Sequence, residues 1–196
     1  MSNFLLNAVA GALIVANTYV QEARHYSSFQ SGLLSLGYLV AVLAMIRVGE
    51  KILQRSGPRK PMVLACLLVI TGIILMTFTP SNSIYSIVVF IGFTVYGIGL
   101  GLYATPSTDT AVDNVPEAKA GKAAGIYKMS STLGGSFGLA LSVAVYSAIA
   151  KAGNMEAAAS IGLLANAIFA GLALLAVVTV IPKAGVKKPI KERKAL

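Results

Sequence analysis

The chain has 196 residues, of which 56% are hydrophobic and only 12% are charged. Soluble domains carry about 45–50% apolar and about 25% charged residues, so this composition excludes an ordinary soluble globule and also a disordered chain. The net charge of +9 would suggest nucleic-acid binding in a soluble protein, whereas in a membrane protein it indicates Lys- and Arg-rich cytoplasmic loops. The single cysteine, Cys66, excludes an intramolecular disulfide and a cysteine-cluster metal site.

Six apolar stretches follow one another along the chain, and each is long enough for a helix that crosses a hydrocarbon core of about 30 Å. They lie at residues 3–20, 29–48, 61–79, 84–103, 123–149 and 157–181. The strands of a membrane barrel would instead alternate in segments of about ten residues. The sequence therefore predicts an all-α membrane domain of six transmembrane helices over residues 1–182, followed by a basic tail at 183–196.

Positive charge is divided unevenly between the two sets of connections. One set consists of the connections after the second and fourth stretches and the C-terminal tail; the other set holds only Arg24 and Lys151. The first set holds Arg47, Lys51, Arg55, Arg59, Lys60, Lys119, Lys122, Lys183, Lys187, Lys188, Lys191, Arg193 and Lys194. Because cytoplasmic loops are enriched in Lys and Arg, both termini are predicted to be cytoplasmic. The basic tail is expected to attract anionic lipid headgroups, in preference to nucleic acid.

The N-terminal stretch begins a few residues after Met1 without a preceding Lys or Arg. A secretory signal peptide would carry a charged n-region and a small-residue cleavage site, so that interpretation is excluded. A first membrane span normally has a charge cue that sets its orientation. We therefore expect that the coding sequence once continued upstream with further apolar spans.

Two glycine motifs resemble enzyme signatures without the context that the chemistry needs. Residues 134–138 match G-x-S-x-G, but they lie inside an apolar helix, and the only histidine is His25 in a predicted outer loop. Residues 97–101 lack the third glycine and the acidic partner of a dinucleotide site. We expect no enzyme activity, no cofactor and no metal site.

The same glycines are spaced for helix packing. Small residues four apart line one helix face and let another helix approach closely, either as static packing or as faces that slide during transport. The pairs are Gly97 and Gly101, Gly121 and Gly125, and Gly134 and Gly138. Because these lie mainly in the fourth and fifth spans, we expect those two spans to pack closely, on a central pathway.

Candidate pathway residues are the ionisable, aromatic and amide side chains near these spans. They are Lys128, Asp109, Tyr96, Tyr127 and Asn17. Lys128 lies inside the fifth span, where it either snorkels to the interface or faces a polar cavity and pairs with Asp109 or Asp113. The two aspartates share a helix face if the fourth span continues past Pro106, and they either take part in a cytoplasmic charge latch or are solvated. No carboxylate lies in the middle of a span, where proton-coupled carriers usually place one.

The connection after the second span, GEKILQRSGPRK at 49–60, resembles the basic loop of the major facilitator superfamily, G-x-x-x-D-R-x-G-R-R. The positions that correspond to the motif are Gly49, Arg55, Gly57, Arg59 and Lys60. Gln54 stands where the family has Asp, and Gly49 is displaced by one. By this resemblance the segment is a cytoplasmic gating loop, and the chain is one six-helix half of a transporter built from two such halves.

Longer stretches at 19–32, 97–106 and 115–138 resemble the fourteen-helix drug:proton antiporter branch of that superfamily, and residues 104–110 and 126–129 especially resemble its quinolone-efflux members. The resemblance implies that the chain corresponds to helices nine to fourteen, the C-terminal half. It implies export of amphipathic drugs, such as quinolones and amphipathic cations, in exchange for protons across the bacterial plasma membrane. The family's first half, which carries the antiporter signature and the main coupling acids, has no counterpart here.

Three alternatives remain open at this point. The chain could be an inactive truncated remnant, a half-transporter that pairs with itself or with a separate N-terminal partner, or a regulatory membrane subunit. Its expected partners are the lipid bilayer, small amphipathic drug-like substrates and protons, with no nucleic acid.

Overall fold

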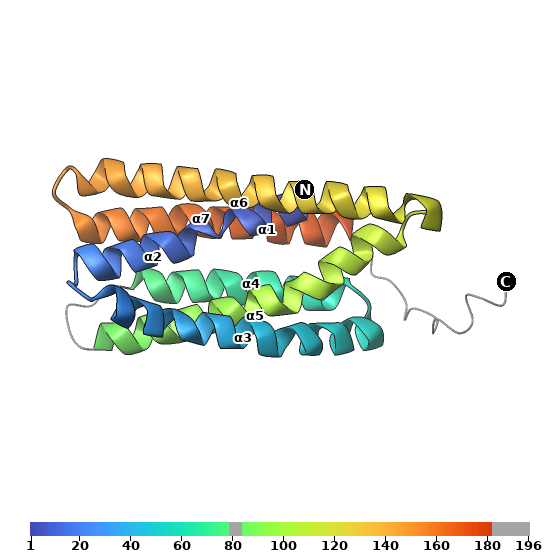
Figure 1. Ribbon diagram of the computed structural model, residues 1–196, viewed down its shortest axis with the longest axis horizontal. Coiled ribbons are helices and arrows are strands. Elements are labelled where there is room, and N and C mark those ends of the chain that lie inside the picture. Colours follow the sequence, from blue (N-terminus) through green and yellow to red (C-terminus); the bar gives the residue numbers. More distant parts are fainter. Residues whose placement is uncertain (79–83, 182–196) are drawn as a thin grey trace.

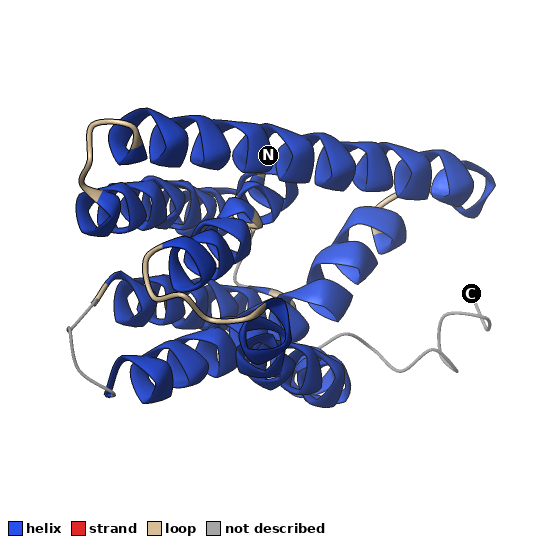
Figure 2. Cartoon of the chain, turned by 60° about the vertical axis from the view of Figure 1, so that its left-hand side comes forward, coloured by secondary structure: helices blue, strands red, loops and turns tan. Residues whose placement is uncertain are grey.

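The structure is a computed structural model that describes residues 1–78 and 84–181, a region that contains helices and no strand (Figure 2). The helices are α1 (Ser2–Ala8), α2 (Gly11–Glu22), α3 (Ser28–Ser56), α4 (Arg59–Thr77), α5 (Ile84–Asp113), α6 (Ala120–Ala150) and α7 (Met155–Val180), with a short 3₁₀ helix at Glu117–Lys119. Taken together, α1 and α2 form one of six segments that are long and apolar enough to cross a membrane. The predicted all-α fold with six transmembrane segments is confirmed. The basic tail at 183–196 lies outside the described residues.

The helices form two groups that run along a common axis (Figure 1). In one group α5 packs on both α3 and α4, and in the other α6 and α7 enclose α1 and α2. Contacts between α4 and α7 join the groups. Beyond its middle, α5 leaves the first group and crosses toward α6 (Figure 1).

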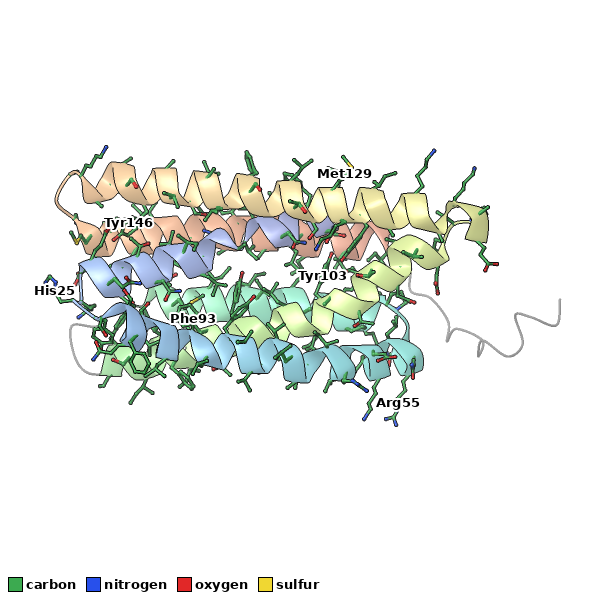
Figure 3. The ribbon with its side chains drawn as sticks, in the orientation of Figure 1. His25, Arg55, Phe93, Tyr103, Met129 and Tyr146 are labelled. Carbon is green, nitrogen blue, oxygen red and sulfur yellow. The ribbon has the colours of Figure 1, made fainter. Side chains whose placement is uncertain are left out.

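The two ends of the bundle differ in charge. Arg55 marks one end and His25 the other (Figure 3). We name the end that holds the α3–α4 and α5–α6 connections the basic end, and the end that holds the α2–α3 and α6–α7 connections the far end. The predicted cytoplasmic connections therefore meet at one end of the bundle.

Two helices extend beyond their predicted apolar stretches. The second span continues as helix to Ser56, so most of the predicted gating loop is helical and only Gly57 and Pro58 separate α3 from α4. The charged residues at 50–55 have good helix propensity, and the buried Leu53 anchors this last part of α3. The fourth span continues past Pro106 to Asp113, which places Asp109 and Asp113 on one helix, as considered above.

The first span is interrupted at Val9 and Ala10. Three amides around the break bond to the carbonyl three residues earlier, as in a 3₁₀ turn: Val9 N to Leu6 O (3.4 Å), Ala10 N to Asn7 O (3.1 Å) and Ala12 N to Val9 O (3.0 Å). Gly11, which follows the break, faces Ser142 of α6 so closely that a Cβ would overlap its side chain. The sequence pattern gives no sign of this break, because the stretch is uniformly apolar.

The glycine pairs of the fourth and fifth spans pack against different helices. Gly97 and Gly101 lie against the backbone of α3 at Tyr38 and Val42. Gly134 and Gly138 lie against the backbone carbonyls of Phe4 and Ala8 in α1. The fourth and fifth spans do contact one another, but their glycines are not at that contact, because each pair faces the backbone of another helix.

The third pair, Gly121 and Gly125, differs from the others. Each of these glycines has nothing within 4 Å of an added Cβ, so they make no close helix contact within the described bundle. The predicted packing role for this pair is not found here. Its face of α6 is exposed together with Lys128 and Thr132.

We predict that Gly138→Ala destabilises the bundle, because the new Cβ would meet the Ala8 backbone, which cannot move aside like a side chain. The expected cost is about 1–3 kcal/mol. The matched control is Gly125→Ala on the same helix, where the Cβ has open space and helix propensity improves by about 0.5–1 kcal/mol. The melting temperature of each variant is measured in detergent, with the folded fraction determined by size-exclusion chromatography after heating. Equal melting temperatures for the two would contradict the packing argument.

Candidate functional site

A pocket of about 400 Å³ opens at the basic end, where α1, α5 and α6 meet the ends of α4 and α7. Its polar side chains include Asn3, Ser107, Thr110 and Tyr127, and its remaining wall is mainly apolar. The lining residues are Met1, Ser2, Asn3, Met62, Tyr103, Ser107, Thr110, Ala111, Ala123, Ile126, Tyr127, Ser130, Val180 and Ile181. Ligand pockets of this size usually combine such apolar walls with a few placed polar groups.

Tyr127 connects three helices in this pocket. Its hydroxyl shares a 2.6 Å hydrogen bond with Ser107 Oγ of α5, and its backbone carbonyl accepts a 2.9 Å hydrogen bond from Asn3 Nδ2 of α1. Asn3 and Ser107 are both buried. Both α1 and α5 are therefore tied to α6 at this single residue.

Pro106 positions Ser107 for this contact. A proline within a helix removes one backbone donor and bends the helix, here leaving the Leu102 carbonyl without its usual N–H. Gly49 of α3 lies against that carbonyl, and a Cβ at Gly49 would come within 2.9 Å of it. Hydroxyl groups bond neighbouring carbonyls, with Thr110 Oγ1 donating to Pro106 O at 2.7 Å. Thus Gly49, placed in the gating loop by the sequence motif, packs on the bend of α5.

A second pocket, of about 430 Å³, opens at the far end between α2 and α6. Its lining residues are Ile14, Val15, Thr18, Glu22, Val143, Tyr146, Ser147, Ala150 and Lys151. The Tyr146 hydroxyl donates a 3.0 Å hydrogen bond to Glu22 Oε2 across this pocket. A carboxylate, an ammonium group and a tyrosine therefore share one otherwise apolar pocket.

The seam that α1 and α2 form with α6 is closed between these two pockets. Gly134 and Gly138 meet the α1 backbone there, and Gly11 meets Ser142. Ser142 Oγ donates to Gly138 O at 2.6 Å and accepts from Asn166 Nδ2 of α7 at 2.8 Å, and both side chains are buried. The seam is thus open at each end and sealed in the middle by glycine contacts and a buried polar cluster.

Tyr96 and Asn17, two of the predicted pathway residues, hold the first span in place. Tyr96 is fully buried, and its hydroxyl donates a 2.9 Å hydrogen bond to the Val9 carbonyl at the helix break. Asn17 Oδ1 accepts from Ser31 at 2.5 Å and from Ser35 at 3.2 Å, which ties α2 to α3.

The remaining pathway candidates occupy other surfaces. Lys128 is exposed on α6. Asp109 is half-buried and borders a shallow pocket of about 520 Å³ on α5 with Thr105 and Thr108. The five predicted residues are therefore spread along the bundle, and Tyr127 is the one that lines the basic-end pocket.

The short α3–α4 connection orients the other motif residues. Gly57 ends α3 with a φ of 74°, a left-handed conformation that favours glycine. Arg59 Nη2 donates a 2.8 Å hydrogen bond to the Val178 carbonyl in the last turn of α7. The helix dipole also favours a positive charge at this end of the helix. Arg55 and Lys60 are exposed.

Several residues that build these pockets escape the sequence pattern. Glu22 follows the first apolar stretch, where it resembles a solvated loop residue. Asn3 lacks any motif, and Ser107 lies in a stretch of family resemblance that assigns it no role. Only Tyr146 carried a signal, as one of several tyrosines near a span end. Pairing of Glu22 with Tyr146 depends on tertiary contact between helices 124 positions apart in sequence.

We predict that Tyr96→Phe loosens the break in the first span, because Val9 O loses a buried hydrogen bond. Because Val9 O keeps its bond from Ala12 N, the expected cost is the net contribution of one hydrogen bond, about 0.5–1.5 kcal/mol. Hydrogen exchange of the amides at 9–12 in detergent is expected to accelerate. Tyr38→Phe is the control, since Tyr38 packs its ring against Tyr96 at 5.9 Å without contacting Val9 through its hydroxyl. Unchanged exchange in Tyr96→Phe would show that the hydroxyl does not hold the break.

Comparison with known proteins identifies the family. The model of the Major Facilitator Superfamily matches residues 1–195. The chain is 53% identical over 184 residues to Quinolone resistance protein NorB of Staphylococcus aureus strain MRSA252, and equally so to that of strain COL. These alignments cover 93% of this chain and 40% of each relative, so the chain spans about two fifths of the length of these relatives. The chain belongs to the Major Facilitator Superfamily of transporters and is a multi-pass membrane protein.

Proposed function

We propose that the chain forms the C-terminal half of a proton-coupled multidrug efflux antiporter. The observation that carries this proposal is the 53% identity with a quinolone resistance protein over 93% of the chain. Its substrates would be quinolones and amphipathic cations, exported in exchange for protons. The apolar and aromatic walls of the two pockets suit amphipathic molecules.

The proposed location is the bacterial plasma membrane, with both termini in the cytoplasm. The basic connections at 47–60 and 119–122 meet at one end of the bundle, and the positive-inside bias supports a cytoplasmic position for that end. The first residues of α1 line the pocket at the same end, which supports a cytoplasmic N-terminus.

The surfaces of α3 and α6 support a partner within the membrane. Only 11% of the α3 span and 22% of the α6 span are buried, compared with 56% of the first span. α3 exposes Leu36, Leu39 and Leu43, whereas α6 exposes small and polar residues beside its apolar ones. We propose that a second six-helix unit covers these faces, either a separate N-terminal half or a second copy of this chain.

Alternating access would use the seam between the first span and α6. The pocket at one end would widen while the other closes, with the glycine contacts at Gly134 and Gly138 as the fulcrum. Because Tyr127 ties α6 to both α1 and α5 at the basic end, rupture of its bond to Ser107 would accompany opening on that side. These contacts support the proposal that Tyr127 and the connection at 49–60 control the cytoplasmic side.

The proposal is tested by quinolone and ethidium efflux from cells that lack their own exporters. Three strains are compared. One expresses the chain alone, one expresses the chain together with the part of NorB that it does not match, and one expresses that part of NorB alone. We expect efflux only when both parts are present, and its abolition by a protonophore.

The other outcomes discriminate among the alternatives. Efflux by this chain alone would show a self-pairing half-transporter. Stable insertion without efflux in any combination would contradict the proposal and favour a regulatory subunit, whereas failure to insert would favour an inactive remnant.

Lys128 is proposed to face the substrate pathway, because it lies on the exposed face of α6 that also carries Gly121, Gly125 and Thr132. In cells that express both parts, Lys128→Gln is expected to lower efflux at least about tenfold. The reason is that a charged side chain within a membrane span costs free energy and usually marks a substrate or ion pathway. Lys122→Gln, at the exposed start of the same helix, is the control and is expected to retain activity. Unchanged efflux and expression in Lys128→Gln would assign the side chain to the interface.

A further inference from the structure

We propose that the far-end pocket between α2 and α6 binds an amphipathic organic cation, with Glu22 as its charge partner and Tyr146 as the residue that positions Glu22. The inference rests on the transport function proposed above and adds to it a site and a recognition group. The pocket lies outside the connection at 49–60 and outside the basic-end pocket that contains Tyr127.

Glu22 gives the pocket wall a negatively charged group. Glu22 is the last residue of α2, where the helix dipole already favours a positive group. The Tyr146 hydroxyl, on a side chain only 4% exposed, fixes Glu22 by its bond to Oε2. A carboxylate has two oxygens and about four lone-pair positions, so this bond leaves capacity for a second, cationic partner. An exposed carboxylate held toward a pocket by a buried tyrosine has a defined position that a solvated surface acid lacks.

The rest of the pocket wall is mainly apolar. Ile14 of α2 is 42% exposed and Val143 of α6 is 40% exposed, and both line the pocket. Its volume of about 430 Å³ falls in the range of about 300–1,000 Å³ that is typical of small-molecule sites. An apolar cleft with an acid at its rim fits a molecule that combines a hydrophobic body with one positive charge.

Two basic side chains near this pocket, Arg24 and Lys151, are potential competitors for Glu22. The guanidinium of Arg24 stacks on aromatic rings, 4.6 Å from the centroid of Tyr85 and 5.6 Å from that of Tyr19. Lys151 is the base that lines the pocket itself, and its exposed, flexible side chain can move aside for a ligand. His25 and Glu156 border a different pocket, which shares Glu22 with this one.

The test measures binding by the purified chain of 196 residues in lipid nanodiscs. The probe is radiolabelled tetraphenylphosphonium, a permanent cation, and its shape-matched anion tetraphenylborate is the reference. Binding to empty nanodiscs is subtracted from both. We expect saturable binding of the cation and no saturable binding of the anion. Equal saturable binding of both ions, or none of either, would overturn the proposal.

Variants then assign the site. Glu22→Gln, which keeps the size of the side chain, is expected to weaken cation binding by about tenfold, equivalent to about 1.4 kcal/mol. Tyr146→Phe is expected to weaken cation binding by a smaller factor. A higher content of anionic lipid in the nanodiscs is not expected to restore cation binding in either variant. Glu156→Gln is the matched control at the same end and is expected to bind like the parent chain. Lys151→Ala removes a competing cation and is expected to bind more tightly.

The proposal is overturned if Glu22→Gln binds the cation as tightly as the parent chain, or if Glu156→Gln weakens binding as much as Glu22→Gln. Size-exclusion profiles and circular dichroism must match among the variants before their affinities are compared. Because this assay uses the chain without a second half, binding can fail while efflux by the assembled transporter succeeds. Cation binding by the purified chain without efflux by the assembled transporter would remove the transport proposal and leave this binding site.

Discussion

The need to satisfy every backbone polar group inside the membrane determines how this bundle can depart from straight helices. Lipid offers no hydrogen-bond donor to a free carbonyl, and each unsatisfied group costs several kcal/mol. The chain nevertheless contains two interruptions, the break at Val9 and the bend at Pro106. At the first, the Val9 carbonyl accepts a 3₁₀-type bond from Ala12 N and a second bond from the Tyr96 hydroxyl. At the second, Gly49 lets the α3 backbone approach Leu102 O, and hydroxyl groups such as Thr110 bond the neighbouring carbonyls.

These two interruptions bring the parts of the candidate site together. The break at Val9 lies beside the contact between Gly138 and Ala8, so the first span changes course where the seam with α6 is tightest. The bend at Pro106 carries Ser107 away from the α3–α4 group and to Tyr127. Without the bend, the two groups of helices would lack this connection at the basic end. The local cost of each interruption is therefore linked to the contacts that join one helix group to the other.

Sequence reasoning succeeded where the signal is one-dimensional. Hydropathy and length locate six spans, and the spacing of Arg and Lys separates the two ends, because both depend on composition along the chain. It failed where the outcome depends on which helices meet. Glycines four apart predict close packing, yet nothing in their spacing shows that Gly134 and Gly138 face α1 whereas Gly121 and Gly125 face outward. The break in the first span has no marker either, since Tyr96, whose hydroxyl bonds the Val9 carbonyl, lies 87 positions away.

The charges at the two ends of the seam suit opposite tasks. At the basic end the pocket is lined by hydroxyl and amide groups and is surrounded by Lys- and Arg-rich connections, which disfavour a resting place for a cation. At the far end the pocket contains Glu22, held by Tyr146. A positive charge is therefore less unfavourable in the far-end pocket, where the Glu22 carboxylate opposes it, than in the basic-end pocket. Lys151 lines the same pocket, so any cation that binds there has to compete with its ammonium group for the Glu22 carboxylate.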